Sequence, residues 1–420
     1  GWAAEARASR TAAWAAFAGI LALYWAAWAA IVCAAGPRRG ALLAPALWAV
    51  LEWARGWGSI GFPWVELGAS QWAFSPVFQG ARAFGVHAVS AAVVAVNVAL
   101  WAWVRPRRAL AGLSAGSAGV WLAGLALAAA VTRIPAGRAG TGAPLRVAAL
   151  QGSFTEEEKW SLPLSTILGR FEDLALKAEK SDLMIWPETA TAEIWEEQPE
   201  IAARARRLAV RTGAAQLIGS VQRGKDGRFH NAVVLVTAGG EAGRVMKRHL
   251  VPFGEYIPGW FRRFAPFARK LTSGVVDFSP GEASGIIEIP GGPRCGVLVC
   301  YEANFSGLVR DQVRAGAEVL VNVTNDAWYR RTAATWQHAL GPVCRAVEYG
   351  RWLVRCANTG VSFIAGPDGG VWAPVGVFVP GVVAGTLPPL SGATPYALWG
   401  EWPLILAGAA AWAAGRARRR

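Results

Sequence analysis

Long apolar runs fill the first third of the chain and return near its end, while the middle has the mixed texture of a soluble domain. Because a bilayer core needs about 20 mostly apolar residues per helix, five runs are candidate membrane spans. They lie at 11–35, 41–57, 84–104, 109–132 and 397–415. The pattern therefore predicts a membrane protein with a water-soluble domain between its fourth and fifth spans.

Basic residues cluster beside these apolar runs, at 36–40, 105–108 and 416–420. The net charge of +14 alone would also suit nucleic-acid binding, but the middle region has no aromatic–basic motif of that kind. Basic residues collect in the cytoplasmic loops of membrane proteins. All three clusters fit one topology, which puts 133–395 and residue 1 outside the cytoplasm. A complete protein that begins in the cytoplasm would then have an odd number of further spans upstream.

Three charged residues fall inside the predicted spans, namely Glu52, Arg55 and Glu401. Charges within spans mark transport pathways by default. These are few and lie near the span ends, so we expect them to reach the interface or to pair with one another.

Short β-like runs alternate with helical stretches in the middle region. The predicted strands are 145–152, 182–188, 215–222, 231–240, 294–300, 318–325, 352–360 and 362–370. The predicted helices are 156–179, 199–211, 305–315 and 332–349. Such alternation favours a layered α/β fold. Segments rich in Pro and Gly at 134–144 and 387–395 bound it, so we expect domains at 1–132, 133–395 and 396–420.

Three residues of complementary chemistry follow or lie near strand-like runs: Glu188, Lys247 and Cys300. Layered α/β folds place their sites at strand ends. A thiolate is a strong nucleophile, and a nearby cation favours it. A carboxylate can take the thiol proton and return it to a leaving group, and a lysine can stabilise an oxyanion. Taken singly, each residue has an ordinary explanation. Cys300 could be a buried thiol, Glu188 a neighbour of a helix cap and Lys247 a solvated surface charge.

The five cysteines are odd in number and have neither CxxC nor zinc spacing, so no disulfide framework is expected. Cys295 and Cys300 differ by an odd step on one predicted strand and should face opposite sides. We assign Cys295 to packing. The other cysteines lie in apolar segments and are also expected to be structural: Cys33, Cys344 and Cys356. Three histidines lack metal-ligand spacing and are expected in structural or loop positions: His230, His249 and His338.

Several long motifs occur in one order along the chain. They are WPETA at 186–190, KRHLVPFGEYIP at 247–258, VCYE at 299–302, NDAWY at 325–329 and RAVEYGRWLVRCANTG at 345–360. Together with GFPWVELGASQ at 61–71, they closely resemble the apolipoprotein N-acyltransferase family, which are membrane enzymes of the nitrilase superfamily. The resemblance covers essentially the whole chain, whereas WPE with VCYE alone would indicate only the superfamily.

The resemblance implies an αββα sandwich domain, inserted between transmembrane α-helices, on the outer side of a bacterial cytoplasmic membrane. Motif by motif, Glu188 resembles the general base, Lys247 the oxyanion-stabilising lysine and Cys300 the nucleophile. The same matching implies supporting roles for four residues: Glu255 beside the lysine, Tyr301 and Glu302 beside the nucleophile, and Trp328 near the acyl-chain entrance.

The reaction that the resemblance implies is a two-step acyl transfer. Cys300 would take an acyl chain from a phospholipid, typically phosphatidylethanolamine. The resulting thioester would pass the chain to the α-amine of a diacylglyceryl-cysteine at an apolipoprotein N-terminus. Covalent catalysis suits two bulky lipids because each can use the same site in turn. No metal, organic cofactor or nucleic-acid partner is implied, and we expect a monomer.

Two features depart from the family pattern. After NDAWY the chain has Arg330 and Arg331, where the family more usually has a stretch that contains Gly and an acidic residue. They either favour anionic lipid headgroups or are solvent-exposed loop charges. The family also usually has eight membrane helices, so three would be missing before the five predicted here.

Two other functions remain open from the residues alone. A membrane-tethered nitrilase-type amidase would use the same three residues with water as acceptor, but it leaves the membrane spans unexplained. A non-enzymatic polytopic protein with an outer binding domain leaves the Glu–Lys–Cys set unexplained.

Overall fold

The computed structural model describes residues 2–73, 75–104, 137–140, 142–264, 277–282 and 284–417. The chain divides into two compact units. The helical unit comprises Gly1–Arg133 and Trp399–Arg420, and the sandwich unit comprises Ile134–Leu398. The predicted span at 109–132 and the basic cluster at 105–108 lie outside the described residues.

Two six-stranded sheets form the centre of the sandwich unit. The first has the order β12-β11-β10-β9-β8-β7 and the second the order β13-β2-β3-β4-β5-β6. The strands of the first sheet are β7 Ile286–Glu288, β8 Arg294–Val299, β9 Val319–Thr324, β10 Trp352–Ala357, β11 Ser362–Ala365 and β12 Val371–Val375. Those of the second are β2 Leu145–Gln151, β3 Leu183–Ile185, β4 Ala215–Arg223, β5 Phe229–Thr237, β6 Gly240–Met246 and β13 Gly381–Leu387. A separate pair joins β1 Arg138–Ala139 to β14 Leu390–Ser391.

Each sheet has a parallel centre and antiparallel edges. Strands β8, β9 and β10 run parallel in the first sheet, and β2, β3 and β4 do so in the second. The central strands are buried nearly throughout their lengths, which is why they appear in the sequence as continuous apolar runs. The carboxyl ends of β3 and β8 deliver Glu188 and Cys300.

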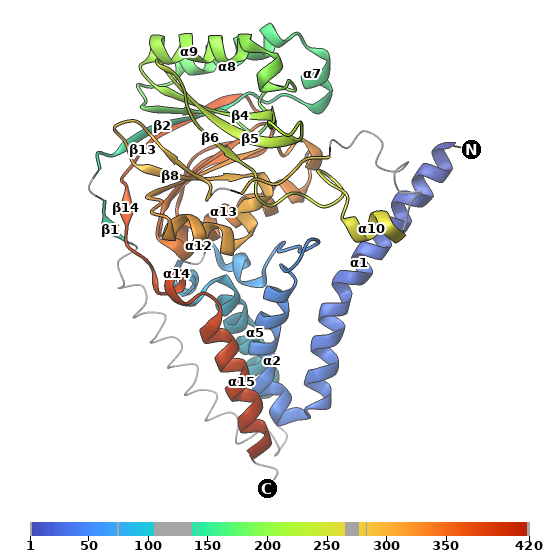
Figure 1. Ribbon diagram of the computed structural model, residues 1–420. Helices are drawn as coiled ribbons and strands as arrows, with labels where there is room; N and C mark the ends of the chain where they lie inside the picture. Colours follow the sequence, from blue (N-terminus) through green and yellow to red (C-terminus); the bar gives the residue numbers. More distant parts are fainter. Residues whose placement is uncertain are drawn as a thin grey trace. The chain divides into compact units, whose positions relative to one another are not determined.

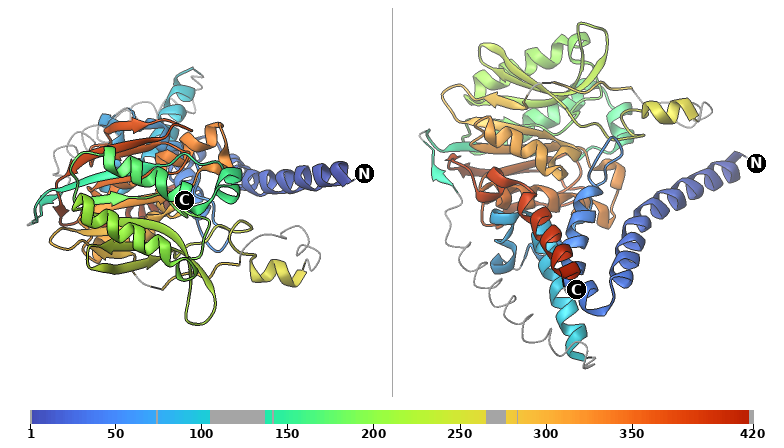
Figure 2. Two further views of the ribbon diagram at one scale, coloured as in Figure 1. Left: turned by 90° about the horizontal axis from the view of Figure 1, so that it is seen from above. Right: turned by 60° about the horizontal axis from the view of Figure 1, so that its bottom comes forward.

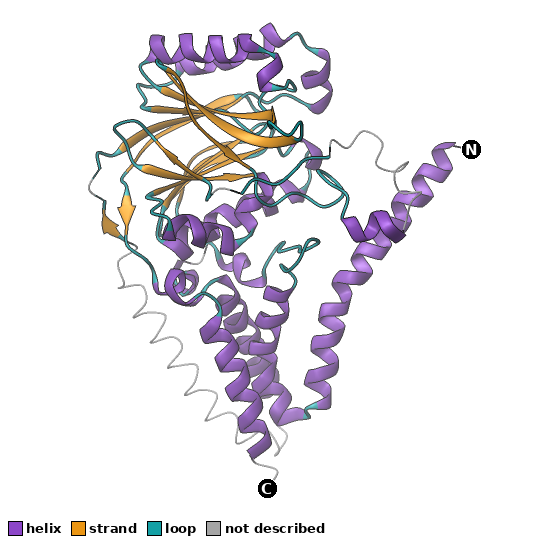
Figure 3. Ribbon diagram, in the orientation of Figure 1, coloured by secondary structure: helices purple, strands orange, loops and turns teal. Residues whose placement is uncertain are grey.

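Helices cover the outer face of each sheet (Figures 1 and 3). Helices α8 (Leu164–Lys177) and α9 (Pro199–Thr212) lie side by side over the second sheet, as the view from above also shows (Figure 2). Helices α12 (Ser306–Arg314) and α13 (Ala333–Tyr349) cover the first sheet. The layers therefore run helix, sheet, sheet, helix, and the predicted αββα class is confirmed.

Helix α9 shows how the sequence specifies these outer layers. Its buried residues, Ile201, Ala205, Leu208 and Ala209, recur at helical spacing, and its arginines occupy other positions. Pro199 opens the first turn, and the left-handed Gly213 ends the helix.

The predicted helix at 156–179 was wrong in one respect, because the structure has two helices there. These are α7 (Glu156–Ser161) and α8. Leu162 between them has an extended backbone, because the residue before a proline is disfavoured in the helical conformation. Strands β6, β7, β12 and β13 were missed. Strand β6 is exposed at most positions, so it lacks the apolar run that marks the central strands.

The helical unit contains α1 (Trp2–Ala34), α2 (Pro37–Ala54), α5 (Val86–Val104) and α15 (Trp402–Ala417). Shorter helices are η1 (Leu67–Gln71), α3 (Ser75–Phe78) and α4 (Ala81–Phe84) here, and η2 (Trp195–Glu197), α10 (Gly259–Phe264) and α14 (Pro395–Trp399) elsewhere in the chain. Among the described residues, two segments are long and apolar enough to cross a membrane, Trp14–Ala34 and Val86–Val104.

The charged residues of the predicted spans are buried within the helical unit, and each has a polar partner there. Glu52 accepts hydrogen bonds from the Leu67 amide at 2.8 Å and from the Ser90 hydroxyl. Arg55 donates to a loop carbonyl, and Glu401 lies 2.9 Å from the ring of His87. These contacts fasten the loop between α2 and α5, and the helix α15, within the unit.

Candidate active site

Cys300 lies at the turn that follows β8. Its backbone has φ +54°, a left-handed conformation that is uncommon for a residue with a side chain. Asn322 stabilises this turn, because its amide donates to the carbonyls of Leu298 at 3.1 Å and Cys300 at 3.3 Å. The short helix η3 (Cys300–Asn304) begins at once. The sheet therefore holds the thiol at a fixed, strained position at the strand end.

Glu188 follows β3 in the other sheet and is buried. Its Oε1 accepts a hydrogen bond from the Asn231 amide at 2.7 Å, and its Oε2 accepts one from the backbone N–H of Asn325 at 2.8 Å. The Cys300 thiol lies beside this carboxylate, close enough for each group to shift the pKa of the other. The two sheets thus bring a carboxylate and a thiol together from positions more than a hundred residues apart.

Lys247 follows β6 and is only 1% exposed. Its Nζ lies 3.2 Å from Glu188 Oε1 and 2.8 Å from Glu255 Oε1. Glu255 is fixed in turn, since its Oε2 accepts the Val251 amide at 2.8 Å. Asn231 donates to both carboxylates. Hydrogen bonds therefore connect Glu188, Lys247 and Glu255, and Cys300 lies beside Glu188. Of these four sequence-predicted residues, Glu255 is partly buried and the other three are buried.

The electrostatics of this cluster favour an ionised carboxylate beside a neutral thiol. Burial raises the pKa of the Cys300 thiol and Glu188 raises it further, which together outweigh the lowering effect of Lys247. Burial would raise the pKa of Glu188 too, but Lys247 and the hydrogen bonds outweigh it and lower that pKa. Burial lowers the pKa of Lys247, yet the two carboxylates and Cys300 raise it well above its usual value. The resting thiol thus keeps its proton until a base removes it.

Glu302 links the Cys300 turn to the Lys247 segment. Its carboxylate accepts three backbone N–H groups, from Arg248 at 2.6 Å, from His249 at 3.0 Å and from Val299 at 2.8 Å. Tyr301 is buried, and its ring meets that of Phe305 edge to face. Glu302 and Tyr301, which follow Cys300 in the sequence, therefore help to fix the position of the turn that carries the thiol.

Trp328 differs from these residues because its side chain is 76% exposed. It lies in the short helix η4 (Ala327–Tyr329), three positions after Asn325, whose amide contacts Glu188. The tryptophan is thus an exposed apolar side chain on a segment that reaches the buried cluster.

Several polar residues of the site were missed by the sequence analysis. Asn231 and Asn325 bind the Glu188 carboxylate. Beneath them, Asp326 pairs with Arg355 at 2.7 Å and with His338 at 2.8 Å, all fully buried. Asn325 and Asp326 belong to the NDAWY motif, so that motif could have identified them as site residues. No motif in the sequence marked Asn231.

Arg330 and Arg331 are both exposed. Arg331 donates to the Val377 carbonyl at 3.4 Å, and its guanidinium lies over the ring of Phe378. Arg330 has a left-handed backbone, with φ +51°. Arg331 is therefore held against its own domain.

The other cysteines do not join the cluster. Cys295, Cys344 and Cys356 are fully buried, and Cys33 is exposed. Within the described ranges, no group of three His, Cys, Asp or Glu side chains is arranged to hold a metal ion.

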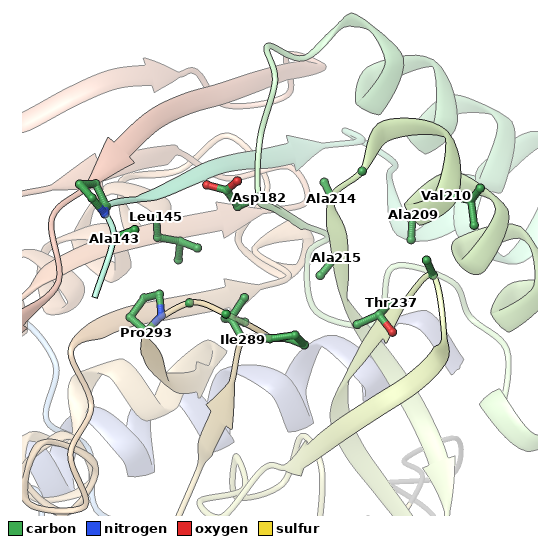
Figure 4. Close-up of a pocket in the computed structure, with 16 residues that line it drawn as sticks. Ala143, Leu145, Asp182, Ala209, Val210, Ala214, Ala215, Thr237, Ile289 and Pro293 are labelled. Atoms are coloured by element: carbon green, nitrogen blue, oxygen red, sulfur yellow. The ribbon is translucent and has the colours of Figure 1, made fainter. Parts of the chain in front are cut away.

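A cavity of about 500 Å³ lies at the opposite ends of the strands (Figure 4). It is lined by the starts of β2 and β4 at Leu145 and Ala215, by Asp182 before β3, and by Pro293 before β8. Glu188 and Cys300 follow the carboxyl ends of β3 and β8. This cavity therefore lies at the opposite, amino-terminal ends of these strands. None of the cluster residues lines it.

Known proteins match both parts of the chain. A family model described as carbon-nitrogen hydrolase matches residues 146–396, and one described as apolipoprotein N-acyltransferase N-terminal domain matches residues 1–99. An amidase from Nesterenkonia sp. AN1 is a structural neighbour with a TM-score of 0.47 and 20% identity, over 64% of this chain and 98% of the amidase.

Curated relatives share one name over most of the chain. An apolipoprotein N-acyltransferase from Geobacter metallireducens is 36% identical, over 95% of this chain and 79% of the relative. One from Methylococcus capsulatus is also 36% identical, over 87% of this chain and 72% of the relative. The chain therefore belongs to the apolipoprotein N-acyltransferase family.

Proposed function

We propose that this protein transfers a fatty acyl chain from a phospholipid to the N-terminal α-amine of a diacylglyceryl-cysteine apolipoprotein, through a thioester on Cys300. The observation that carries the proposal is the position of the Glu188 carboxylate, which binds the Lys247 ammonium and lies beside the Cys300 thiol. A nucleophile, a base and a cation in contact are the parts that acyl transfer needs.

In the first step, Glu188 takes the thiol proton as Cys300 Sγ attacks the ester carbonyl carbon of the phospholipid. A tetrahedral intermediate forms. Its collapse breaks the ester C–O bond, and Glu188 returns the proton to the departing glycerol oxygen. The products are a thioester and a lysophospholipid. Because the pKa of the thiol is raised, this step depends on the base.

Lys247 is proposed to stabilise the oxyanion of each tetrahedral intermediate. Its ammonium has three N–H groups, and two of them go to Glu188 and Glu255. The third is left for the oxyanion. Since Lys247 is fully buried among low-dielectric surroundings, its charge acts more strongly than it would in water.

In the second step, the α-amine of the acceptor attacks the thioester carbonyl. Glu188 accepts a proton from the amine, the C–S bond breaks, and the proton returns to the Cys300 sulfur. The amide product leaves a regenerated thiol. One site thus serves a lipid donor and a lipid-modified acceptor in turn.

Four further residues are proposed to support this chemistry. Glu255 would hold Lys247 in place through their 2.8 Å contact. Glu302, with Tyr301 beside it, would keep Cys300 and the Lys247 segment aligned. Trp328, which is largely exposed, would meet the acyl chain at the entrance of the site.

We further propose that the protein is a multi-pass enzyme of the bacterial inner membrane. Segments 1–132 and 396–420 would form the membrane domain, and 133–395 the catalytic domain on the periplasmic side. The flanking basic clusters support this topology. A reporter fused after Arg420 should be active only in the cytoplasm, and periplasmic activity would overturn the orientation.

The decisive experiment traps the acyl-enzyme. The purified full-length chain is mixed with phosphatidylethanolamine that carries a labelled acyl chain, and hydroxylamine-sensitive label on the protein is counted. We expect label on the wild type and on Cys295→Ala, which removes a buried cysteine of β8, but none on Cys300→Ala. Absence of label from the wild type would defeat the acyltransferase proposal.

A diacylated lipopeptide should then discharge the label into an amide product. Discharge to free fatty acid at the same rate with and without the lipopeptide would instead favour a hydrolase that uses water as its acceptor.

A further inference from the structure

Lys159 is a buried lysine that the mechanism above does not use. It lies on α7 (Glu156–Ser161) and is 5% exposed. A buried ammonium is strongly disfavoured unless hydrogen bonds and opposite charges compensate it. The contacts of Lys159 therefore indicate what its side chain is placed to hold.

The Lys159 ammonium binds the residue that follows Glu188. Its Nζ donates to the Thr189 carbonyl at 2.7 Å and lies 3.4 Å from the Thr189 hydroxyl. Thr189 has φ +42°, an unfavourable left-handed conformation that persists only when neighbouring contacts impose it. Lys159 thus fixes a strained peptide directly beside the proposed base.

Strand β4 holds the same turn from the other side. The Ala190 amide donates to the Gly219 carbonyl at 2.9 Å. A Cβ at Gly219 would lie 2.2 Å from the Pro187 carbonyl oxygen, so only glycine permits this close approach. The Glu188 turn is therefore clamped between β4 and Lys159.

Helix α7 also reaches the Glu188 carboxylate by a second route. Glu156 Oε1 accepts the Asn325 side-chain amide at 2.6 Å, and the backbone N–H of Asn325 donates to Glu188 Oε2 at 2.8 Å. A capping box between Thr155 and Glu158 orders the start of this short helix. One helix thus contacts both the backbone beside the base and the donor that orients its carboxylate.

We infer that Lys159 is a positioning residue for acyl transfer: its hydrogen bond to Thr189 fixes the Glu188 turn, and its positive charge favours the ionised Glu188 carboxylate. The inference rests on the proposed function, since it assigns Lys159 to the base of that reaction. Lys159 acts through Glu188 and is not assigned any contact with substrate.

The surroundings of Glu188 bear on this charge effect. Among the described residues, Glu188 acts electrostatically on Lys159 from α7, Lys247 after β6, Cys300 of η3, Tyr329 of η4 and His338 of α13. Glu255, in the loop after β6, shares the Asn231 donor with Glu188. Lys159 is thus a second cation near the carboxylate, beside the directly bonded Lys247. Burial lowers the pKa of Lys159 to about 8, against the raising effects of Glu156 and Glu188.

The test compares three variants of the full-length protein: Lys159→Met, Lys159→Gln and Lys177→Met. Lys159→Met removes both hydrogen bond and charge, whereas Lys159→Gln retains an N–H donor without charge. Lys177→Met removes an exposed lysine of α8 and is the matched control. The single-turnover rate of thioester formation on Cys300 is measured across pH, with the phospholipid concentration dependence and the melting temperature.

For Lys159→Met we expect a fall of at least about tenfold in the maximal rate, since a displaced general base loses much of its contribution. Loss of a cation raises the pKa of a nearby carboxyl, so the acidic limb should move to higher pH by about one unit in both Lys159 variants. The phospholipid concentration for half-maximal rate should stay unchanged, and Lys177→Met should match the wild type.

A purely structural lysine would behave differently. A lower melting temperature with an unshifted acidic limb in both Lys159 variants would overturn the inference, and so would wild-type rates in both. If Lys159→Met does not fold, the position of the acidic limb in the pH–rate profile of Lys159→Gln alone tests the inference. Wild-type protein without a thioester would defeat the proposed function and this inference together, whereas wild-type label with unaffected Lys159 variants would defeat only the inference.

Discussion

The carboxylate of Glu302 accepts the backbone N–H of Arg248 at 2.6 Å, although the two residues are 54 positions apart in the chain. The same carboxylate accepts the Val299 amide directly before Cys300. We predict that Glu302→Gln lowers the rate of thioester formation about 100-fold, because a misplaced reacting group is costly. The glutamine NH₂ would face a backbone N–H where the carboxylate now accepts one. Single-turnover labelling of Cys300 measures the effect.

Glu288→Gln is the matched control, because that carboxylate lies on β7 and its side chain is 71% exposed. The control should leave the labelling rate unchanged. The free energy of unfolding of Glu302→Gln should fall by about 1–3 kcal/mol, the usual effect of an unsatisfied buried group. A Glu302→Gln protein with the wild-type labelling rate would contradict the bracing role.

The pH dependence of the first step should reflect the lowered pKa of Glu188. That pKa lies below its ordinary value of 4.5, because the charge of Lys247 and the hydrogen bond from Asn231 help to outweigh burial. A carboxyl with a depressed pKa is ionised above it and is protonated only as the pH falls through it. We expect thioester formation to persist down to below pH 4.5 in protein that circular dichroism shows to be folded. An acidic limb near neutral pH would contradict this assignment.

The layers and the central chemistry could be predicted from the sequence because both depend on local patterns. Strands such as β8 are buried on both faces, so they appear as apolar runs that end where polar residues begin. Glu188 and Cys300 follow such runs, which made them visible. The edge strand β6 is mostly exposed and left no comparable signal, although it positions Lys247.

Long-range partners could not be predicted in this way. The contact between Asn231 and Glu188 joins residues 43 positions apart, and the fold alone determines it. Lys159 follows three glutamates at 156–158, a pattern typical of a solvated helix face. Its contact with Thr189 joins residues 30 positions apart, and the fold determines that contact.

The buried ion pair beneath the site should contribute strongly to stability. Asp326 accepts from Arg355 at 2.7 Å and lies 2.8 Å from His338, and all three side chains are fully buried. We predict that Asp326→Asn lowers the free energy of unfolding by about 3–5 kcal/mol, because it leaves a buried guanidinium without a counter-charge. Thermal unfolding of the full chain in detergent measures the loss.

The exposed pair of Arg294 and Glu288 provides the comparison. Glu288→Gln should change the free energy of unfolding by less than about 1 kcal/mol, as is usual for surface ion pairs. If Glu288→Gln and Asp326→Asn lower the free energy of unfolding equally, the buried network contributes no more to stability than a surface ion pair does.

The close approach of β4 to the Glu188 turn gives the sharpest geometric prediction. A Cβ at Gly219 would lie 2.2 Å from the Pro187 carbonyl oxygen and 2.6 Å from the Glu188 Cα. Because both are backbone atoms, the turn itself must move, and the carboxylate moves with it. We expect Gly219→Ala to lower the rate of thioester formation by about 100-fold, the scale of loss for a small displacement of a reacting group. Gly243→Ala is the control, since a Cβ there meets nothing within 4 Å. If Gly219→Ala labels Cys300 as fast as Gly243→Ala, the rate does not depend on the position of Glu188, and another group must remove the thiol proton.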